Sequence, residues 1–159
     1  MLFPALPHSR PRIALIANDI RRQRRRREHA VLEIAHLLPV DKHDLPKAEA
    51  VVALGYPAVE ALLPELITWM QDINWPVAKI LTPFLAGIGE PLAPHLRMIF
   101  ESEDHVWKYR VLDKLVAPSP RLAVAVEPYL LRMALEPSLG ESGEEVDEIA
   151  RRILAKTAA

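Results

Sequence analysis

The sequence predicts an all-α protein, a short α-α superhelix preceded by a basic helix or arm. Apolar residues recur at helical spacing almost everywhere, while the alternation typical of strands is nearly absent. Glycine occurs only five times and proline fifteen times in 159 residues. Two short patterns return with offsets of 32 and 34 residues, and a period of this length is typical of helical repeat proteins. We therefore expect stacked helix pairs and no strand.

The composition limits the classes of protein to which the chain can belong. Its 159 residues suffice for one domain with a substantial core. It contains no cysteine, which excludes disulfides, thiolate nucleophiles and cysteine-ligated metal sites. No apolar run approaches about 18 residues, and the first twenty residues lack the pattern of a secretory signal. We expect a cytoplasmic protein without a membrane span.

Charge is divided between the two ends of the chain. Residues 1–27 carry eight arginines against the single acidic residue Asp19, a balance of +7. From Glu28 onward, twelve basic residues face twenty acidic ones, a balance of −8. A basic arm is thus joined to an acidic body. We divide the chain into an arginine-rich extension, residues 1–36, and a helical-repeat domain, residues 37–159.

The first segment, residues 9–38, has helical spacing with an arginine run in its middle. Ser9 is a plausible N-cap, and Pro11 falls where the first turn of a helix tolerates proline. The run interrupts the apolar face for more than two turns. The segment is either one long helix with a solvated middle or a frayed arm followed by a short helix from about Glu28, and we prefer the second interpretation.

Beyond residue 40 the chain alternates between two kinds of helix start. Helices of the first kind begin at Gly-x-Pro, at Gly55 and again at Gly89. Helices of the second kind begin at Asp-x-x-Trp, at Asp72 and again at Asp104. A further helix of the first kind is expected over residues 120–135, with a loop over residues 136–143. We expect four helices of the second kind, beginning near Asp44, Asn74, Asp104 and Glu144.

Capping chemistry explains these starts. Glycine ends one helix in a left-handed cap, and proline is pre-set for the first turn of the next. Asp and Asn accept hydrogen bonds from the free N–H groups at a helix start, and a tryptophan that follows is a packing residue. Four prolines fall inside expected helices and should bend them: Pro64, Pro83, Pro94 and Pro128.

These blocks resemble a known family. The segments "LLPVDKHDL", "ALGYPAVEALLPEL", "QDINWPVAKILTPFLAGIGEPLAPHLRMIF", "DHVWKYRVLDKLV" and "EEVDEIARRIL" are similar to the bacterial domain of unknown function numbered 5071, over about Leu37 to Leu154. The resemblance implies a HEAT-like or armadillo-like fold, here about three helix pairs in a short right-handed superhelix. It implies no activity, and residues 1–36 lie outside it.

The candidate site is a rim formed by the starts of the second kind of helix, which lie on one edge of such a fold. One interpretation is a polar, aromatic-containing groove that binds a peptide or a small anion. The other, which we favour, is that the acids are N-caps, the tryptophans pack between units and the lysines pair with neighbouring acids. The rim comprises Lys42, His43, Asp44, Asp72, Asn74, Trp75, Asp104, Trp107, Lys108, Tyr109, Glu144 and Glu145.

Catalysis and metal binding have little support in the sequence. His43 lies beside Asp44, and His105 beside Asp104, but neighbours in sequence rarely face each other, and no nucleophile or phosphate-loop motif accompanies them. His29, Glu33 and His36 share a helical face without a second ligand cluster. We expect no enzymatic activity, no cofactor and no metal.

The function we expect is therefore non-enzymatic: a helical-repeat module that binds a protein or peptide partner, in a specific version an inhibitor or immunity-type protein whose acidic body masks a basic partner. The alternative is non-specific nucleic-acid binding through the arm, since no aromatic residue is interleaved to stack bases. An uncharacterised enzyme is the second alternative. The six residues of the arm are Arg21, Arg22, Arg24, Arg25, Arg26 and Arg27.

Overall fold

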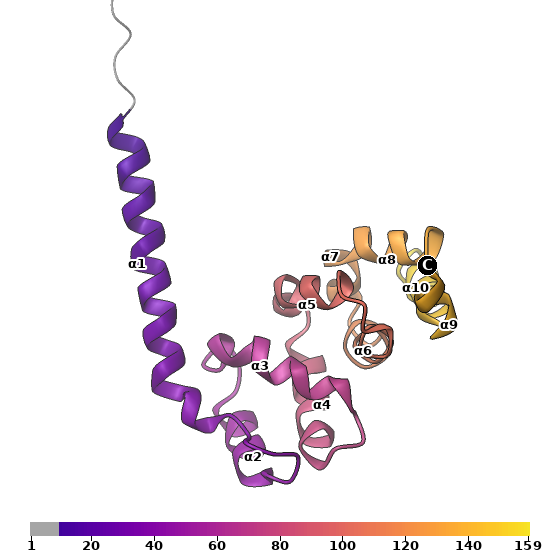
Figure 1. Ribbon diagram of the computed structural model, residues 1–159, viewed down its shortest axis with the longest axis horizontal. Helices are drawn as coiled ribbons and strands as arrows, with labels where there is room; N and C mark the ends of the chain where they lie inside the picture. Colours follow the sequence, from indigo (N-terminus) through magenta and orange to yellow (C-terminus); the bar gives the residue numbers. More distant parts are fainter. Residues whose placement is uncertain (1–9) are drawn as a thin grey trace, which may run out of the picture. The chain divides into compact units, whose positions relative to one another are not determined.

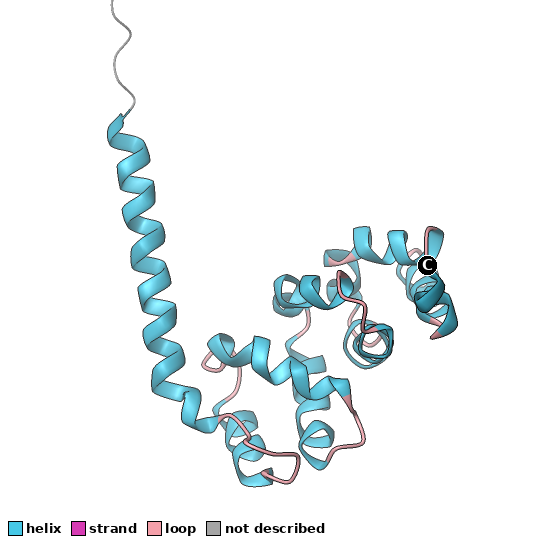
Figure 2. Cartoon of the chain, in the orientation of Figure 1, coloured by secondary structure: helices cyan, strands magenta, loops and turns pink. Residues whose placement is uncertain are grey.

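The structure, a computed structural model, describes the backbone of residues 10–159 (Figure 1). The chain divides into two compact units, Met1–His36 and Leu37–Ala159. All regular structure in residues 10–159 is helical, and Figure 2 shows helices joined by short loops. The prediction of an all-α fold is confirmed.

The first unit is dominated by one uninterrupted helix, α1 (Arg10–Ile34), followed by the 3₁₀ turn η1 (Ala35–Leu37). The predicted frayed arm with a short helix from Glu28 is therefore wrong, and the alternative of one long helix is correct. Arginine is a strong helix former, and side chains one turn apart support the helix: Arg24 Nε lies 2.9 Å from Glu28 Oε1. The expected cap, Ser9, lies outside the described residues.

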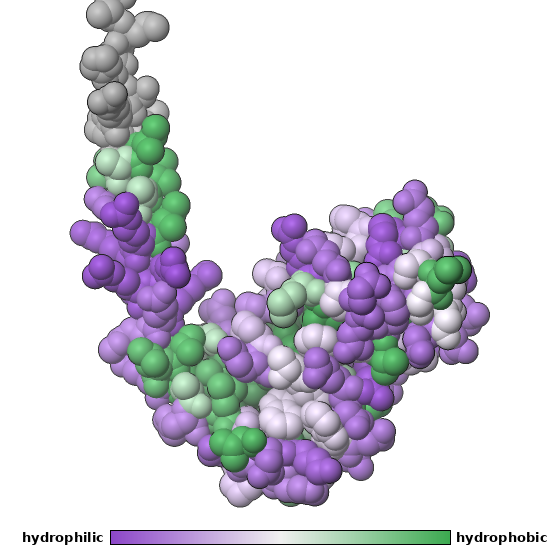
Figure 3. Space-filling model, viewed as in Figure 1, coloured by the Kyte–Doolittle hydropathy of each residue, from purple (hydrophilic) through white to green (hydrophobic). Residues whose placement is uncertain are grey.

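The side chains of α1 change in character along its length, and the helix ends in a second apolar stretch that includes Val31, Leu32 and Ile34. Figure 3 shows a hydrophobic band in the part of the helix next to the grey residues, followed by a strongly hydrophilic band. The six arginines of the arm are all exposed. The arginine run is therefore a solvated segment within a continuous helix.

The second unit contains thirteen helical elements within residues 37–159. In chain order they are α2 (Leu45–Leu54), η2 (Glu60–Leu62), α3 (Leu63–Thr68), η3 (Trp69–Gln71), α4 (Pro76–Ile88), η4 (Glu90–Leu92), α5 (Ala93–Phe100), α6 (His105–Val111), the π-helix η5 (Leu112–Val116), α7 (Pro120–Ala125), α8 (Glu127–Leu135), α9 (Leu139–Gly143) and α10 (Val146–Thr157).

Helices of the second kind form one packed row in this unit. α2 packs on α4, α4 packs on η5, which continues α6, and both α6 and η5 contact α10. Their first residues, Leu45, Pro76, His105 and Val146, lie within two positions of the predicted starts. This row is compatible with a HEAT-like superhelix, which stays a prediction.

Helices of the first kind are shorter and more broken than expected. After Gly55 the chain makes turns before η2 begins at Glu60, so the helix does not start at Pro57. The expected helix over residues 120–135 is divided into α7 and α8, which meet at Val126. Each break leaves a short apolar face, and these faces supply much of the core: Leu62, Leu66, Leu92, Leu96, Leu122 and Leu130 are fully buried.

Three of the four prolines expected to bend helices instead begin them. Pro64, Pro94 and Pro128 occupy first-turn positions of α3, α5 and α8. Proline is tolerated there because the first N–H groups of a helix have no intrahelical partner. Of the four, only Pro83 lies beyond the first turn of its helix, in the interior of α4. The prediction of bending is therefore wrong for the other three.

The expected aspartate caps differ from one helix to the next. Asp104 caps α6, because its Oδ1 accepts a hydrogen bond from Trp107 N at 2.9 Å. Asp72 instead closes a turn by accepting from Asn74 N at 3.0 Å, while α4 begins without a side-chain cap. Asp44 accepts from Val40 N and makes no cap bond to α2. The capping interpretation thus holds for Asp104 and is wrong for Asp44 and Asp72.

Candidate functional site

A short helix stands where the sequence predicts a loop. α9 begins at a capping box: Ser138 Oγ accepts from Glu141 N at 3.2 Å, and a Glu141 carboxylate oxygen accepts from Ser138 N at 2.9 Å. The Ser-x-x-Glu spacing of residues 138–141 is the signature of this motif. The signal was therefore present in the sequence, and the prediction of a loop over residues 136–143 is wrong.

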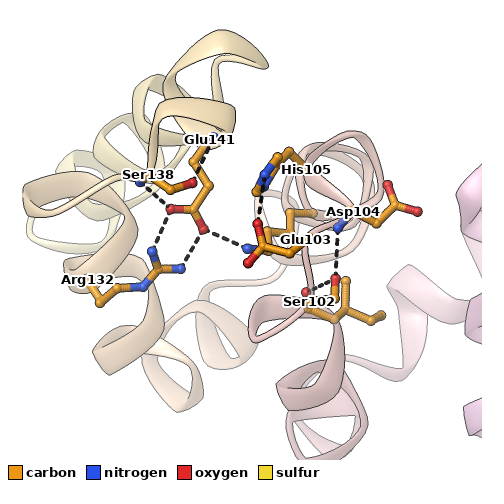
Figure 4. Close-up of polar contacts among 9 residues, drawn as sticks. Ser102, Glu103, Asp104, His105, Arg132, Ser138 and Glu141 are labelled. Carbon is orange, nitrogen blue, oxygen red and sulfur yellow. Dashed lines mark hydrogen bonds and ion pairs between the residues drawn. The ribbon is translucent and has the colours of Figure 1, made fainter.

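The carboxylate of Glu141 is the centre of a buried ionic network. Its side chain is 1 % exposed. Lys108 Nζ donates to Oε1 at 2.8 Å, and Arg132 donates through Nη2 to Oε1 at 2.6 Å and through Nη1 to Oε2 at 2.5 Å. Figure 4 shows the carboxylate of α9 held between the guanidinium of α8, the backbone of Ser138 and an amine from α6. Three helices are thus joined at one acidic group.

This environment keeps Glu141 ionised. Burial by itself raises the pKa of a carboxyl group. The hydrogen bonds from Arg132, Lys108 and Ser138 outweigh burial and lower the pKa of Glu141 to about 2, from an ordinary value of 4.5. The hydrogen bond with Glu141 in turn raises the pKa of Arg132. Glu141 is therefore a charged structural group near neutral pH.

Gly140, the residue before Glu141, allows α9 to lie directly on α6. A Cβ at this position would stand 2.2 Å from the Cδ2 and Nε2 atoms of His105. The close approach of the imidazole ring is what requires glycine at position 140. Backbone conformation is not the reason, because Gly140 does not have a positive φ. The contact holds α9 against the first residue of α6.

A pocket of about 430 Å³ opens beside this network. Phe100 and Tyr129 line it with rings whose centroids are 5.5 Å apart at an angle of 41°, and Pro128 lies beside them. Lys108, Arg132 and Glu141 form its polar part. The pocket therefore has an apolar aromatic wall on one part of its lining and, on another, ionic groups that are already hydrogen-bonded to one another.

One highly exposed carboxylate lines the pocket. Glu103 lines the pocket, its side chain is 92 % exposed, and its described contact is with His105 Nε2 at 3.4 Å. Glu101, which also lines the pocket, is paired with Arg97 at 2.9 Å. Among these acidic groups, Glu103 is the one placed to receive a cation from outside. The arrangement suits a long side chain with an apolar stem and a positive end.

The predicted rim is distributed over several places. Lys42 and His43 are exposed, and the carbonyl of Lys42 accepts from Val77 N at 3.2 Å, so this loop touches the start of α4. Asp44 lies 3.7 Å from Lys47 Nζ. A backbone hydrogen bond thus links the loop before α2 to the start of α4. The side chains of Lys42 and His43 are exposed to solvent.

The two tryptophans of the rim are packing residues. Trp75 is half-buried and meets Trp69 edge to face, with ring centroids 5.6 Å apart. Trp107 is buried, at 8 % exposure. Lys108 is 4 % exposed and belongs to the Glu141 network. Packing describes the two tryptophans, whereas Lys108 pairs with an acid 33 residues away in the chain and not with a neighbouring one.

The last rim residues meet at a second, smaller pocket. Tyr109, Glu144 and Glu145 line a space of about 310 Å³ together with Val106 and Gly143. Both glutamates are exposed. Asp72 and Asn74, which the turn before α4 joins to each other, do not line this pocket.

Candidate metal ligands on α1 form a simple side-chain pair. His29 Nε2 lies 3.2 Å from Glu33 Oε1, and both are exposed. Among the residues that the structure describes, no group of three or more histidine, cysteine or acidic side chains is arranged to hold a metal ion. No described helix is long and apolar enough to cross a membrane.

The fold and the pocket define an all-helical domain built on a row of stacked helices, with an ion network at the base of an aromatic pocket. The chain belongs to the family described as Domain of unknown function (DUF5071), whose model matches residues 37–154. The predicted resemblance is confirmed over the expected span, and α1 lies outside the match. No curated protein matches the chain.

Proposed function

We propose that residues 37–159 form a non-enzymatic binding module that receives a lysine or arginine side chain of a protein or peptide partner in the 430 Å³ pocket. The observation that carries the proposal is the pairing of an aromatic wall with the exposed carboxylate of Glu103. A carboxylate with this exposure is accessible to a cation, and its described side-chain contact, with His105 Nε2 at 3.4 Å, is a weak surface contact. The immunity-type or inhibitor version, in which the acidic body covers a basic partner, is the specific form of this proposal.

The walls of the pocket fit the stem of such a side chain. The methylene groups of lysine or arginine pack on apolar surface while the charged end stays in water or meets a carboxylate. A cation near the face of Tyr129 gains a further attraction to the ring. Because Lys108 and Arg132 are already neutralised in part by Glu141, they repel an incoming cation less than free cations would.

Charge over the whole unit supports the same partner. Residues 37–159 contain twelve basic and eighteen acidic residues, a balance of −6. A surface with one dominant sign raises the rate at which a partner of opposite sign arrives. Binding should therefore weaken as the salt concentration rises.

The candidate acid–base groups support a binding role more than a catalytic one. His43 is exposed, and neither His43 nor His105 lines either of the two pockets described above. His105 instead packs on Gly140. A general base needs access to a bound substrate, and neither histidine lines the 430 Å³ or the 310 Å³ pocket.

A peptide-binding experiment with the full chain tests the proposal. Peptides that share one sequence and differ in a central arginine, glutamine or glutamate are titrated against the chain and read by fluorescence anisotropy. We expect the arginine peptide to bind best, and Glu103→Gln to weaken its binding about twofold to fivefold, in line with one exposed charge pair. The matched control is Glu49→Gln, an exposed glutamate on α2.

Pull-down of native partners gives a second measurement. A partner held by the wild type and by Glu49→Lys but lost by Glu103→Lys supports the proposal. Equal affinity for the three peptides, or equal loss in both glutamate variants, contradicts it.

A further inference from the structure

A surface of the first unit points to a different kind of ligand from that of the pocket. The first half of α1 carries large aliphatic side chains open to solvent: Ile13 is 70 % exposed, Leu15 67 %, Ile16 60 % and Ile20 60 %. The six arginines of the arm follow at once. Ile13, Ile16 and Ile20 recur at helical spacing and lie on one face of the helix.

We infer that α1 is an interfacial helix that lies on an anionic lipid surface. Ile13, Ile16 and Ile20 enter the boundary between headgroups and acyl chains, and the arginine segment pairs with lipid phosphates. Amphipathic helices that bind membranes in this way combine an exposed apolar face with arginine or lysine. The long arginine stems let Arg24 and Arg27, near the apolar face, reach back to the headgroups.

Charge complementarity selects this ligand over a nucleic acid. Phosphate backbones would satisfy the arginines but leave the four aliphatic side chains in water. No aromatic residue occurs between Ile13 and Ile34 to stack on a base. An anionic lipid surface interacts with both the arginines and the aliphatic side chains. Each arginine near the membrane adds electrostatic attraction, and each methylene group that enters the lipid adds to the free energy of binding.

Pairing of two copies through α1 is opposed by the position of the arginines. The helix has 25 residues and its middle residue is Arg22, so the arginine segment starts close to its centre. Parallel pairing over the whole helix places like charges opposite each other, and antiparallel pairing brings them within about one helical turn. Repulsion therefore disfavours both arrangements, whereas an anionic surface neutralises the segment.

Vesicle flotation of the full chain tests the inference. The probes are vesicles of equal parts phosphatidylcholine and phosphatidylglycerol, vesicles of phosphatidylcholine alone, and a duplex DNA of random sequence. We expect the wild type to float with the anionic vesicles, to stay unbound with the neutral ones, and to dissociate as salt is added.

Two sets of substitutions separate the apolar and charged contributions. Ile13→Gln, Ile16→Gln and Ile20→Gln together should lower partition onto anionic vesicles by about tenfold or more, because glutamine keeps the helix but does not enter the lipid. Replacing Arg21, Arg22, Arg25 and Arg26 by glutamine should lower it by a similar factor. Leu139→Gln, which removes a leucine that is 95 % exposed on α9, should change nothing.

The possible results distinguish the ligands clearly. Unchanged flotation of the triple-glutamine variant, equal flotation with neutral vesicles, or binding to DNA without binding to vesicles each overturns the inference. Circular dichroism and thermal unfolding of every variant verify that the fold is intact. The outcome is independent of the peptide-binding role, because Glu103 takes no part in it.

Discussion

Lys108 and Glu141 are 33 residues apart in the chain, yet Nζ of the first donates to Oε1 of the second at 2.8 Å inside the protein. Both side chains are at least nine-tenths buried. A buried charge that loses its partner is strongly destabilising, even where the intact pair adds little. The pair therefore ties α6 to α9 in a way that can be measured by removing one member.

Lys108→Met should lower the free energy of unfolding by about 3 kcal/mol. The methionine fills the space of the lysine stem, but Glu141 keeps only the ion pair with Arg132. Urea denaturation monitored by tryptophan fluorescence measures the change. Lys114→Met is the matched control, because Lys114 is 42 % exposed and pairs with Asp113 at the surface, where we expect less than about 1 kcal/mol. Equal effects of the two substitutions would show that burial of the pair is unimportant.

Acid should weaken the protein through Glu141. The pKa of this group in the folded protein is about 2, below its ordinary value of 4.5. Its contribution to stability is therefore complete above about pH 5 and is lost as the pH falls towards 2. A shift of this size corresponds to about 3 kcal/mol. Comparison of the wild type with Glu141→Gln by urea denaturation between pH 7 and pH 3 measures it, and parallel pH profiles would contradict the assignment.

Gly140→Ala should destabilise the protein by about 1 to 3 kcal/mol, because the new methyl group overlaps the His105 ring. Gly143→Ala in the same helix is the control, since a Cβ there meets no atom within 4 Å, and alanine favours the helix. Thermal unfolding of both variants gives the comparison. Combining Gly140→Ala with His105→Ala should restore part of the loss, and strict additivity of the two changes would argue against the contact.

Asp104→Ala should lower the free energy of unfolding by about 1 kcal/mol, because Trp107 N loses its cap. Asp104→Ser should retain most of that stability, since serine also caps helices. Urea denaturation is again the measurement. A serine variant as unstable as the alanine variant would mean that Asp104 acts through its charge and not as a cap.

The order and type of the elements could be predicted because the relevant signals are local. Helix starts at residues 76, 105 and 146 follow from proline, aspartate and the apolar spacing after them. The errors also have local causes. A proline read as a kink begins a helix when the preceding turn is already broken, as at Pro128, and an aspartate read as a cap closes a tighter turn at Asp72.

The site was less predictable because it depends on contacts between distant segments. The spacing of Ser138 and Glu141 predicts a helix start. Nothing in the local sequence indicates that Lys108 and Arg132 both bind the Glu141 carboxylate. Lys108 stood among the candidate residues, whereas Arg132 and Glu141 did not. Pockets such as the one beside Phe100 arise from the packing of α5, α8 and α9, which the spacing of apolar residues does not specify.

The position of Glu141 near the end of the chain also sets a limit on how far the protein can be shortened. A chain ending at Leu135 would lose α9 and α10, and with them the carboxylate that pairs with Lys108. The row of helices would then lack its last member, whose buried residues include Val146, Ile149 and Ile153. A fragment that ends after α8 should therefore be less stable than one that extends through α10.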